Sequence, residues 1–370
     1  MRRVLLLNVL DLPVNICLSY WWCGGFMLGA FLMIQVVSGF VLSCFYVSGV
    51  DSFSFTVWLL SEDLFYWLIR YVHIWGVTFI FGWLYLHMGR SLYYSSYIKS
   101  GVWNVGFFIY LFMMVEAFLG YVLPWHQMSY WAATVLTSIF KSVPLVGASL
   151  YSFIVGGFSV TSLVLSRAYS AHICIAFVIM GLSVLHLFYL HSGGSNDPIT
   201  VGGSYGDSVR FHEFFTFKDG FVLSFSIWGF LFLMWWFPDS LADSASYVEA
   251  DPMVTPVSIK PEWYFLVFYA MLRSVDSKIG GLIMVLGFLF LMWLPTYNLS
   301  CVYKSGRQMV FWACVSFFFA LTYLGSCHPE IPFSWLSLVY SGLLIILVFL
   351  YKVCWVAPFV SFDVVRDKLG

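Results

Sequence analysis

Long apolar stretches, separated by shorter polar segments, make up most of this chain. A transmembrane helix needs about 20 mostly apolar residues. Eight stretches come close to or exceed that length: 24–47, 66–90, 103–123, 163–190, 218–237, 280–298, 309–326 and 334–355. The pattern predicts an all-α integral membrane protein with eight transmembrane helices.

Three segments between these stretches predict surface structure instead. Pro124, Pro144 and Gly156 interrupt residues 124–162, so we expect short interfacial helices there. Residues 256–273 are apolar but short and contain two prolines near their start, which predicts a surface or re-entrant helix. The polar segment 239–260 is long for a turn and is expected to be a functional loop.

The composition excludes a soluble protein. Hydrophobic residues make up 61% of the chain, charged residues 9%, and the mean hydropathy is +0.90, whereas soluble domains carry about 25% charged residues. The net charge of −1 and the lack of a basic run give no reason to expect nucleic acid binding. The 8 cysteines form no Cys-x-x-Cys pair, which argues against covalent haem and against a zinc site.

The basic residues predict the orientation of the chain, because inner flanks of membrane proteins carry an excess of Lys and Arg. With the N-terminus inside, six of the 17 basic residues lie on the outer side. These six are Arg70, Lys141, Arg167, Lys260, Arg273 and Lys278. We therefore expect the N-terminus on the inner side.

Four histidines repeat one spacing in two of the predicted spans. His73 and His87 are 14 residues apart, and so are His172 and His186. Fourteen residues make about 3.9 helical turns and about 21 Å of rise, so each pair lies on nearly one face. The second and fourth spans run in the same direction. His73 therefore matches His172 near the outer surface, and His87 matches His186 near the inner surface.

Depth-matched histidine pairs favour two haem sites in a bundle of the first four helices. A single histidine in an apolar helix usually fills space or tethers a neighbouring helix. Ionisable residues inside membranes are costly and are commonly functional. Neutral imidazole suits haem iron, and two axial imidazoles leave no open position for oxygen or substrate. The pattern predicts electron transfer through two haems.

Three arginines lie close to these histidines in the sequence. Arg70 precedes His73, Arg167 precedes His172, and Arg90 follows His87. A guanidinium fork suits carboxylates such as haem propionates. The alternative is that these side chains extend from helix ends toward water.

Four glycines repeat the same interval in the neighbouring spans. Gly25 and Gly39 are 14 residues apart in the first span, and Gly106 and Gly120 are 14 apart in the third. Glycine allows a flat macrocycle or another backbone to approach closely. A helix–helix contact explains any one of them, but the repeated interval favours two glycine helices that face the haems.

Further motifs lead to a family resemblance that covers essentially the whole chain. They are Arg70-Tyr-Val-His73, His87-Met-Gly-Arg90, Gly120-Tyr-Val-Leu-Pro-Trp125, His191-x-x-Gly-Ser-Asn196, Lys218-Asp219 and Pro261-Glu-Trp-Tyr264. With them the chain resembles the cytochrome b family, the core of the quinol–cytochrome c oxidoreductase, or complex III. The unsplit chain and the equal histidine spacing resemble the respiratory, mitochondrial type.

The resemblance implies two non-covalent b-type haems and a proton-translocating Q cycle. His73 and His172 would hold the low-potential haem, and His87 and His186 the high-potential one. Quinol would be oxidised near the outer surface. One electron would go to a Rieske iron–sulfur subunit and the other through both haems to quinone at the inner side.

The resemblance also implies residues for two sites that bind ubiquinol and ubiquinone. At the outer site Glu262 would accept a proton or hydrogen bond, in a pocket lined by Tyr264, Tyr121 and Tyr269. At the inner site His191 and Asp219 would bind the quinone carbonyls, with Lys218 nearby.

The same resemblance predicts how the chain is organised and with what it assembles. Residues 1–212 would form the dihaem domain, and residues 213–370 a second four-helix domain with the Pro-Glu-Trp-Tyr loop. Partners would be the Rieske subunit, a c-type cytochrome subunit, accessory subunits, a second copy of the complex and the lipid bilayer. The beginning of the chain predicts neither a signal peptide nor a transit peptide. A mitochondrial inner membrane is favoured over a bacterial plasma membrane.

Five residues depart from the usual pattern of the family. His126, Ala132, Asp276 and Ser192 stand where glycine, glycine, proline and an acidic residue are common. Glu116 lies deep in the third span, where an ionised carboxylate is costly, so we expect it to be protonated or partnered.

Two other functions remain as alternatives. A dihaem membrane subunit of a quinone-linked dehydrogenase would be smaller and would lack Pro-Glu-Trp-Tyr. A transporter or channel with a histidine proton relay predicts internal repeats or broken helices in mid-membrane, and it predicts a colourless protein.

Overall fold

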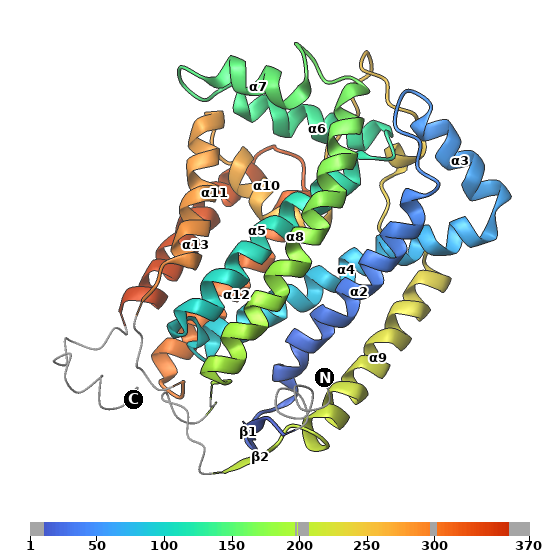
Figure 1. Cartoon of the computed structure of the whole chain (residues 1–370). Helices are drawn as coiled ribbons and strands as arrows, with labels where there is room; N and C mark the ends of the chain where they lie inside the picture. Colours follow the sequence, from blue (N-terminus) through green and yellow to red (C-terminus); the bar gives the residue numbers. More distant parts are fainter. Residues whose placement is uncertain (1–10, 197, 199–206, 297–301, 355–370) are drawn as a thin grey trace.

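The protein is a tilted bundle of long helices capped at one end by short ones (Figure 1). The computed structural model describes residues 11–196, 198, 207–296 and 302–354. Near the N-terminus, strands β1 (Pro13–Asn15) and β2 (Ser208–Arg210) form a small antiparallel sheet in which Val14 pairs with Val209.

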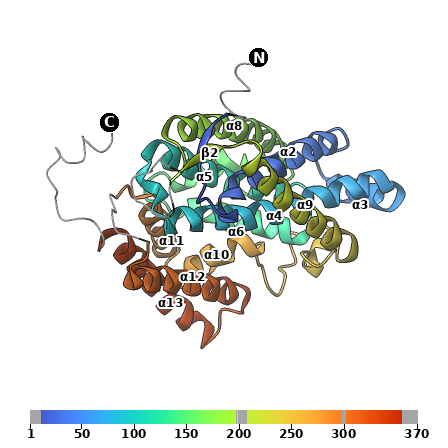
Figure 2. The same cartoon turned by 90° about the horizontal axis from the view of Figure 1, so that it is seen from below.

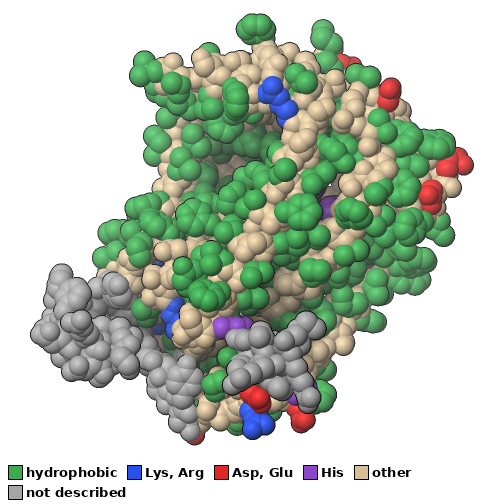
Figure 3. Space-filling model, in the orientation of Figure 1, with side chains coloured by type: hydrophobic (Ala, Val, Ile, Leu, Met, Phe, Trp, Pro, Cys, Tyr) green, Lys and Arg blue, Asp and Glu red, His purple; other side chains and the backbone are tan. Residues whose placement is uncertain are grey.

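Seven of the described helices are long and apolar enough to cross a membrane. They are α2 (Gly24–Ser43), which the 3₁₀ helix η2 (Tyr20–Cys23) precedes, α4 (Leu64–Tyr93), α5 (Ser100–Val122), α8 (Leu163–Gly193), α9 (Phe214–Trp236), α12 (Ser305–Ser326) and α13 (Phe333–Val353). Hydrophobic side chains cover the flank of the bundle, and most charged side chains in view lie toward its ends (Figure 3). The helical membrane fold and seven of the eight predicted spans are confirmed.

The remaining predicted span, 280–298, is shorter than expected. Helix α11 (Lys278–Trp293) has 16 residues, which corresponds to about 24 Å of helix, whereas the hydrocarbon core is about 30 Å thick. It ends before Leu294 because Pro295 follows, and a residue that precedes proline is pushed out of the helical conformation. The last residues of the predicted span lie outside the described part of the chain.

Short helices cover one end of the bundle, as expected for two of the three surface segments. Helices α6 (Gln127–Phe140) and α7 (Gly147–Val155) occupy 124–162, and η5 (Trp263–Phe265) leads into α10 (Leu266–Arg273). The polar loop at 239–260 contains η4 (Ser244–Tyr247). Elsewhere in the chain, η3 (Ser96–Ile98) lies between α4 and α5. Helix α3 (Ser52–Glu62) is an additional helix that the apolar pattern does not predict.

The membrane helices associate mainly in two pairs and one C-terminal group. Helix α2 packs along α4, and α5 packs along α8, while α10, α11, α12 and α13 pack together (Figure 2). Helix α9 contacts α2 and α4. The predicted division of the chain at residues 212 and 213 stays a prediction.

Candidate functional site

The four histidines meet in two pairs across the gap between the two helix pairs. His73 of α4 faces His172 of α8 with ring centroids 6.3 Å apart. His87 of α4 faces His186 of α8 with ring centroids 6.4 Å apart. The two helices therefore run parallel at matched depth, as the sequence predicts.

The ring separations match those of two axial ligands on one metal ion. A metal–imidazole bond is about 2.0 Å long, so two imidazoles on opposite sides of one ion have centroids about 6–6.5 Å apart. No group of three or more His, Cys, Asp or Glu residues in the described part of the chain is arranged to hold a metal. Each pair could therefore supply two imidazole ligands to one metal ion.

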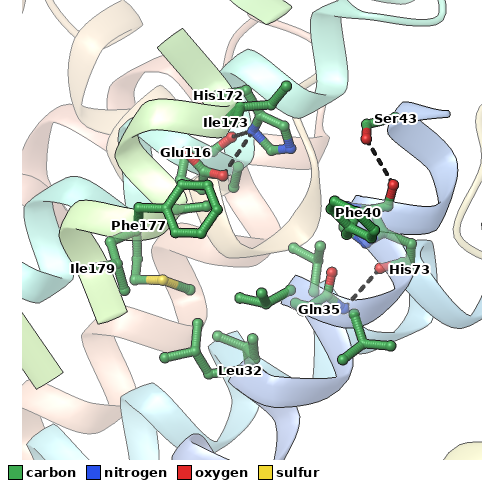
Figure 4. A pocket seen from close by; sticks show the side chains of 18 of the residues that line it. Leu32, Gln35, Phe40, Ser43, His73, Glu116, His172, Ile173, Phe177 and Ile179 are labelled. Atoms are coloured by element: carbon green, nitrogen blue, oxygen red, sulfur yellow. Dashed lines mark hydrogen bonds and ion pairs between the residues drawn. The ribbon is translucent and has the colours of Figure 1, made fainter. Parts of the chain in front are cut away.

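A cavity of about 480 Å³ surrounds the pair nearer the short helices. Its walls come from α2, α4, α5 and α8, and they are almost wholly apolar. Figure 4 shows His73 and His172 on opposite sides of this space, with Leu32, Phe40 and Phe177 around it. Binding pockets for organic ligands commonly measure about 300–1,000 Å³. The cavity is large enough for a flat organic group between the two imidazoles.

Each of the four glycines lies against one of the four imidazole rings. A Cβ atom added at Gly120 would lie 2.7 Å from Cε1 of His172, and one at Gly39 would lie 3.0 Å from Cε1 of His73. The corresponding distances are 2.9 Å from Gly106 to Cε1 of His186 and 3.4 Å from Gly25 to Cε1 of His87. Glycine therefore lets the neighbouring helix approach closely enough to hold each ring against its backbone.

Hydrogen bonds orient the two rings that face the cavity. Nδ1 of His73 lies 2.9 Å from Oγ of Ser38, and Gln35 donates to the His73 carbonyl at 2.9 Å. Nδ1 of His172 lies 2.9 Å from the carboxylate of Glu116. Sequence reasoning does not identify Ser38 and Gln35, because they are single polar residues on α2 whose partners depend on helix packing.

Glu262 lies beside several other titratable groups at the end of the bundle that carries the short helices. Burial, together with the neighbouring Asp243 carboxylate, raises the pKa of Glu262 to about 7. Tyr264 is 5% exposed and stacks on Phe81 with centroids 4.1 Å apart. Tyr121, at the end of α5, lies close enough to interact with Glu262. The structure thus brings Glu262, Tyr264 and Tyr121 close enough for their charges to interact.

Comparisons with known proteins agree with this arrangement. A sequence model of the family described as Cytochrome b/b6/petB matches residues 9–194, and one described as Cytochrome b(C-terminal)/b6/petD matches residues 249–345. The cytochrome b of Brachionus plicatilis is 40% identical over 339 residues, which are 90% of this chain and 89% of that protein. This chain belongs to the cytochrome b family. A chain of a solved structure, described as a hyperthermophilic respiratory complex III, superposes with a TM-score of 0.89 at 27% identity over 97% of this chain and 98% of that chain.

Membership of the cytochrome b family implies binding of b-type haem. Two of the three arginines predicted to lie near the haems have N–H donors that are free to bind a carboxylate. Nη1 of Arg70 and Nε of Arg90 are buried without a hydrogen-bond partner among the described residues. Arg167 instead donates to the carbonyls of Phe153 and Ile154 at the end of α7. It therefore anchors a surface helix in this structure.

Tyr269 holds the loop that precedes Glu262 in this cytochrome b. Its hydroxyl donates to the carbonyl of Ile259 at 2.8 Å, and the guanidinium of Arg273 lies 4.9 Å from the centroid of its ring. Tyr269 thus connects α10 to the segment that leads into Pro-Glu-Trp-Tyr.

The predicted inner residues lie at the opposite end of the bundle, near β1 and β2 (Figure 1). His191 is exposed in the last turn of α8, whereas Asp219 is 8% exposed near the start of α9 and lies beside Cys23. Lys218 donates to the carbonyl of Leu18 at 3.0 Å. Among the described residues, no hydrogen bond or ion pair joins His191 to Asp219.

The residues that depart from the family pattern have identifiable local roles at three positions. His126 is 5% exposed, and its Nδ1 accepts a hydrogen bond from the backbone N–H of Ser129 at the start of α6. Burial and the nearby Arg70 guanidinium lower the pKa of His126 to about 3, so its ring is neutral. Ser192 donates to the carbonyl of Tyr189, and Glu116 contacts His172.

The other two residues that depart from the family pattern, Asp276 and Ala132, make no contact within the described part of the chain that explains their presence. Asp276 is exposed in the turn between α10 and α11. Ala132 is half-buried within α6. Nothing in the structure explains why these two positions differ from the family pattern.

Proposed function

We propose that this chain is the cytochrome b subunit of a proton-translocating quinol–cytochrome c oxidoreductase. It oxidises quinol at its outer end and transfers one electron of each pair through the membrane to quinone at its inner end. The observation that carries this proposal is the two depth-matched histidine pairs, His73 with His172 and His87 with His186, whose ring centroids are 6.3 and 6.4 Å apart.

The residues present fit two b haems, which would carry single electrons between the two ends. His73 and His172 would hold the low-potential haem, and His87 and His186 the high-potential one. The cavity of about 480 Å³ at the His73/His172 pair supports the first assignment, and the four glycines support both, because each lets the neighbouring helix backbone approach an imidazole ring closely. Arg70 and Arg90 would bind propionates through their unpartnered donors.

His87 needs one adjustment to serve as a ligand. Its Nδ1 lies 3.2 Å from Nη2 of Arg90. A neutral imidazole that binds metal through Nε2 carries its proton on Nδ1, so both groups would then be donors. Arg90 would turn its donors toward a carboxylate.

At the outer end Glu262 would accept a proton from quinol. A carboxylate with a pKa of about 7 is divided between its two protonation states at neutral pH, which suits a proton acceptor. Tyr264 and Tyr121 would shelter the quinol ring, and Tyr269 would position the loop. One electron would leave to a Rieske iron–sulfur subunit, and the other would enter the chain near His73.

At the inner end His191 and Asp219 would bind ubiquinone, with Lys218 close by. The exposed imidazole of His191 is open to a carbonyl oxygen, and Asp219 is held beside Cys23 at the start of α9. Lys218 would contribute positive charge near the reduced quinone.

The solved relative belongs to a respiratory complex III, and this supports a multi-subunit assembly. The partners would be a Rieske subunit, a c-type cytochrome, accessory subunits and a second copy of the complex. The chain is a multi-pass membrane protein, and its relative from Brachionus plicatilis supports the mitochondrial inner membrane as its location. The matches in both halves of the chain support this function over a dihaem dehydrogenase subunit.

The test is the quinol-driven reduction of cytochrome c by the purified complex. We expect Glu262→Gln to slow this reaction by about 10²-fold while the dithionite-reduced haem spectrum stays unchanged. The matched control is Glu249→Gln, because Glu249 is an exposed carboxylate on the same outer loop. An intact complex that does not transfer electrons from quinol to cytochrome c would contradict the proposed function.

A further inference from the structure

Glu116 of α5 contacts a predicted haem ligand from inside the membrane. Its Oε1 lies 2.9 Å from Nδ1 of His172, and its backbone carbonyl oxygen lies 3.0 Å from the same nitrogen. The two side chains are 14% and 18% exposed, respectively. Figure 4 shows both contacts on one side of the His172 ring and the cavity on its other side.

This geometry selects one tautomer of the His172 ring. Both acceptors belong to Glu116 and both lie at Nδ1, so this nitrogen carries the proton and donates it. Nε2 is then the nitrogen with a free lone pair, and it is available to a metal in the cavity. Glu116 therefore both orients the ring and fixes its tautomer.

The contact is specific to one of the four histidines. Nδ1 of His73 lies 2.9 Å from the hydroxyl of Ser38, which itself donates to the carbonyl of Ile34 and so accepts from His73. Within the described ranges, His172 is the one predicted ligand with a carboxylate within 4.0 Å. The other oxygen of Glu116, Oε2, is buried without a hydrogen-bond partner there, so the hydrogen bond with His172 is the main stabilising contact of this carboxylate.

A carboxylate that accepts a hydrogen bond from a ligating imidazole makes that imidazole more basic. A more electron-donating axial ligand stabilises oxidised iron, and hydrogen bonds to the ligand are one means by which proteins set haem potentials. We propose that Glu116 is a positioning residue that lowers the reduction potential of the haem held by His73 and His172. This inference rests on the proposed function. A lower reduction potential at the His73/His172 haem favours electron flow from this outer haem to the inner one.

The experiment is a redox titration of both haems in the Glu116→Gln variant of the intact complex. Gln keeps the size of the side chain and one acceptor oxygen but removes the carboxylate. We expect the reduction equilibrium constant of the His73/His172 haem to rise at least tenfold, which is about 59 mV for one electron. The potential of the His87/His186 haem should stay unchanged, and the electron paramagnetic resonance signal of the outer haem should shift.

Two further variants keep the test decisive. Glu116→Met leaves the backbone carbonyl as an acceptor for Nδ1, so the potential can be measured there if Gln impairs haem binding. Ser38→Ala removes a neutral acceptor from His73 and should shift the potential of the same haem less. Unchanged potentials in both Glu116 variants, with two haems bound, would overturn the inference. A wild-type protein without b haems would instead contradict the proposed function.

Discussion

The imidazole rings of His73, His87, His172 and His186 each lie against a glycine of a neighbouring helix. The sequence predicts that each histidine pair and each glycine pair lies on one helix face, because helical rise and turn depend little on their surroundings and an interval of 14 residues brings both members to one face. The contact of each glycine with an imidazole ring is seen only in the structure. The contacts of Ser38 and Gln35 could not be predicted, because they depend on which helices are neighbours. The contact between Glu116 and His172 shows the same limit, since the sequence indicates only that Glu116 needs a partner.

The pKa of Glu262 predicts how quinol oxidation depends on pH. Burial and Asp243 raise this pKa to about 7, so Glu262 is protonated below that pH and accepts a proton above it. The rate should therefore rise as pH increases through about 7. Asp243→Asn removes the neighbouring charge but keeps an acceptor for the N–H of Ala245, so it should move this rise to lower pH. Steady-state rates of quinol oxidation between pH 5 and 9 give the profiles of the wild type and of Asp243→Asn. Identical profiles would contradict the role of Glu262 as the proton acceptor.

Gly120→Ala tests whether the His172 ring needs the close approach of α5. Its added Cβ would lie 2.7 Å from the ring, so Gly120→Ala should displace the imidazole at a cost of about 1–3 kcal/mol. We expect loss of the outer haem and retention of the inner one, measured by the reduced-minus-oxidised spectrum. Gly181→Ala, on the same helix as His172, meets no atom within 4 Å and is the control. Full haem content in both variants would show that the ring does not need this space.

At the scale of elements, the apolar pattern predicts long helices more reliably than their ends and connections. Runs such as Leu163–Gly193 become helices because a backbone in lipid must satisfy its own hydrogen bonds. Helix α11 is shorter than its apolar run because Pro295 ends it. Helix α3 has no long apolar run, and it packs against α4.

The packing of α12 against α10 should control the outer quinol site without affecting the haems. A Cβ at Gly325 would lie 2.2 Å from the carbonyl oxygen of Leu266, and backbone atoms cannot rotate away. Gly325→Ala should therefore separate α10 from α12 and shift Glu262, with a loss of quinol oxidation of about tenfold or more. The matched control is Gly342→Ala on α13, which meets no atom within 4 Å. Equal rates in the two variants, or loss of haem in Gly325→Ala, would contradict this assignment.

At the scale of the whole molecule, two helix pairs hold the two histidine pairs between them. Each pair combines one glycine helix with one histidine helix: α2 with α4, and α5 with α8. This arrangement places both histidine pairs in one bundle, one above the other, with Glu262 and His191 at opposite ends. Parallel direction of α4 and α8 follows from the number of spans between them, which is why matched depth could be predicted from the sequence.

A redox titration of the purified protein, followed by its haem absorption, tests the two-haem assignment most directly. We expect two non-covalent b haems per chain that are reduced at separate potentials. His73→Ala should remove the low-potential step, and His87→Ala should remove the high-potential one. A folded but colourless protein, or two variants that both lose the same step, would contradict the assignment of two haems to two histidine clamps.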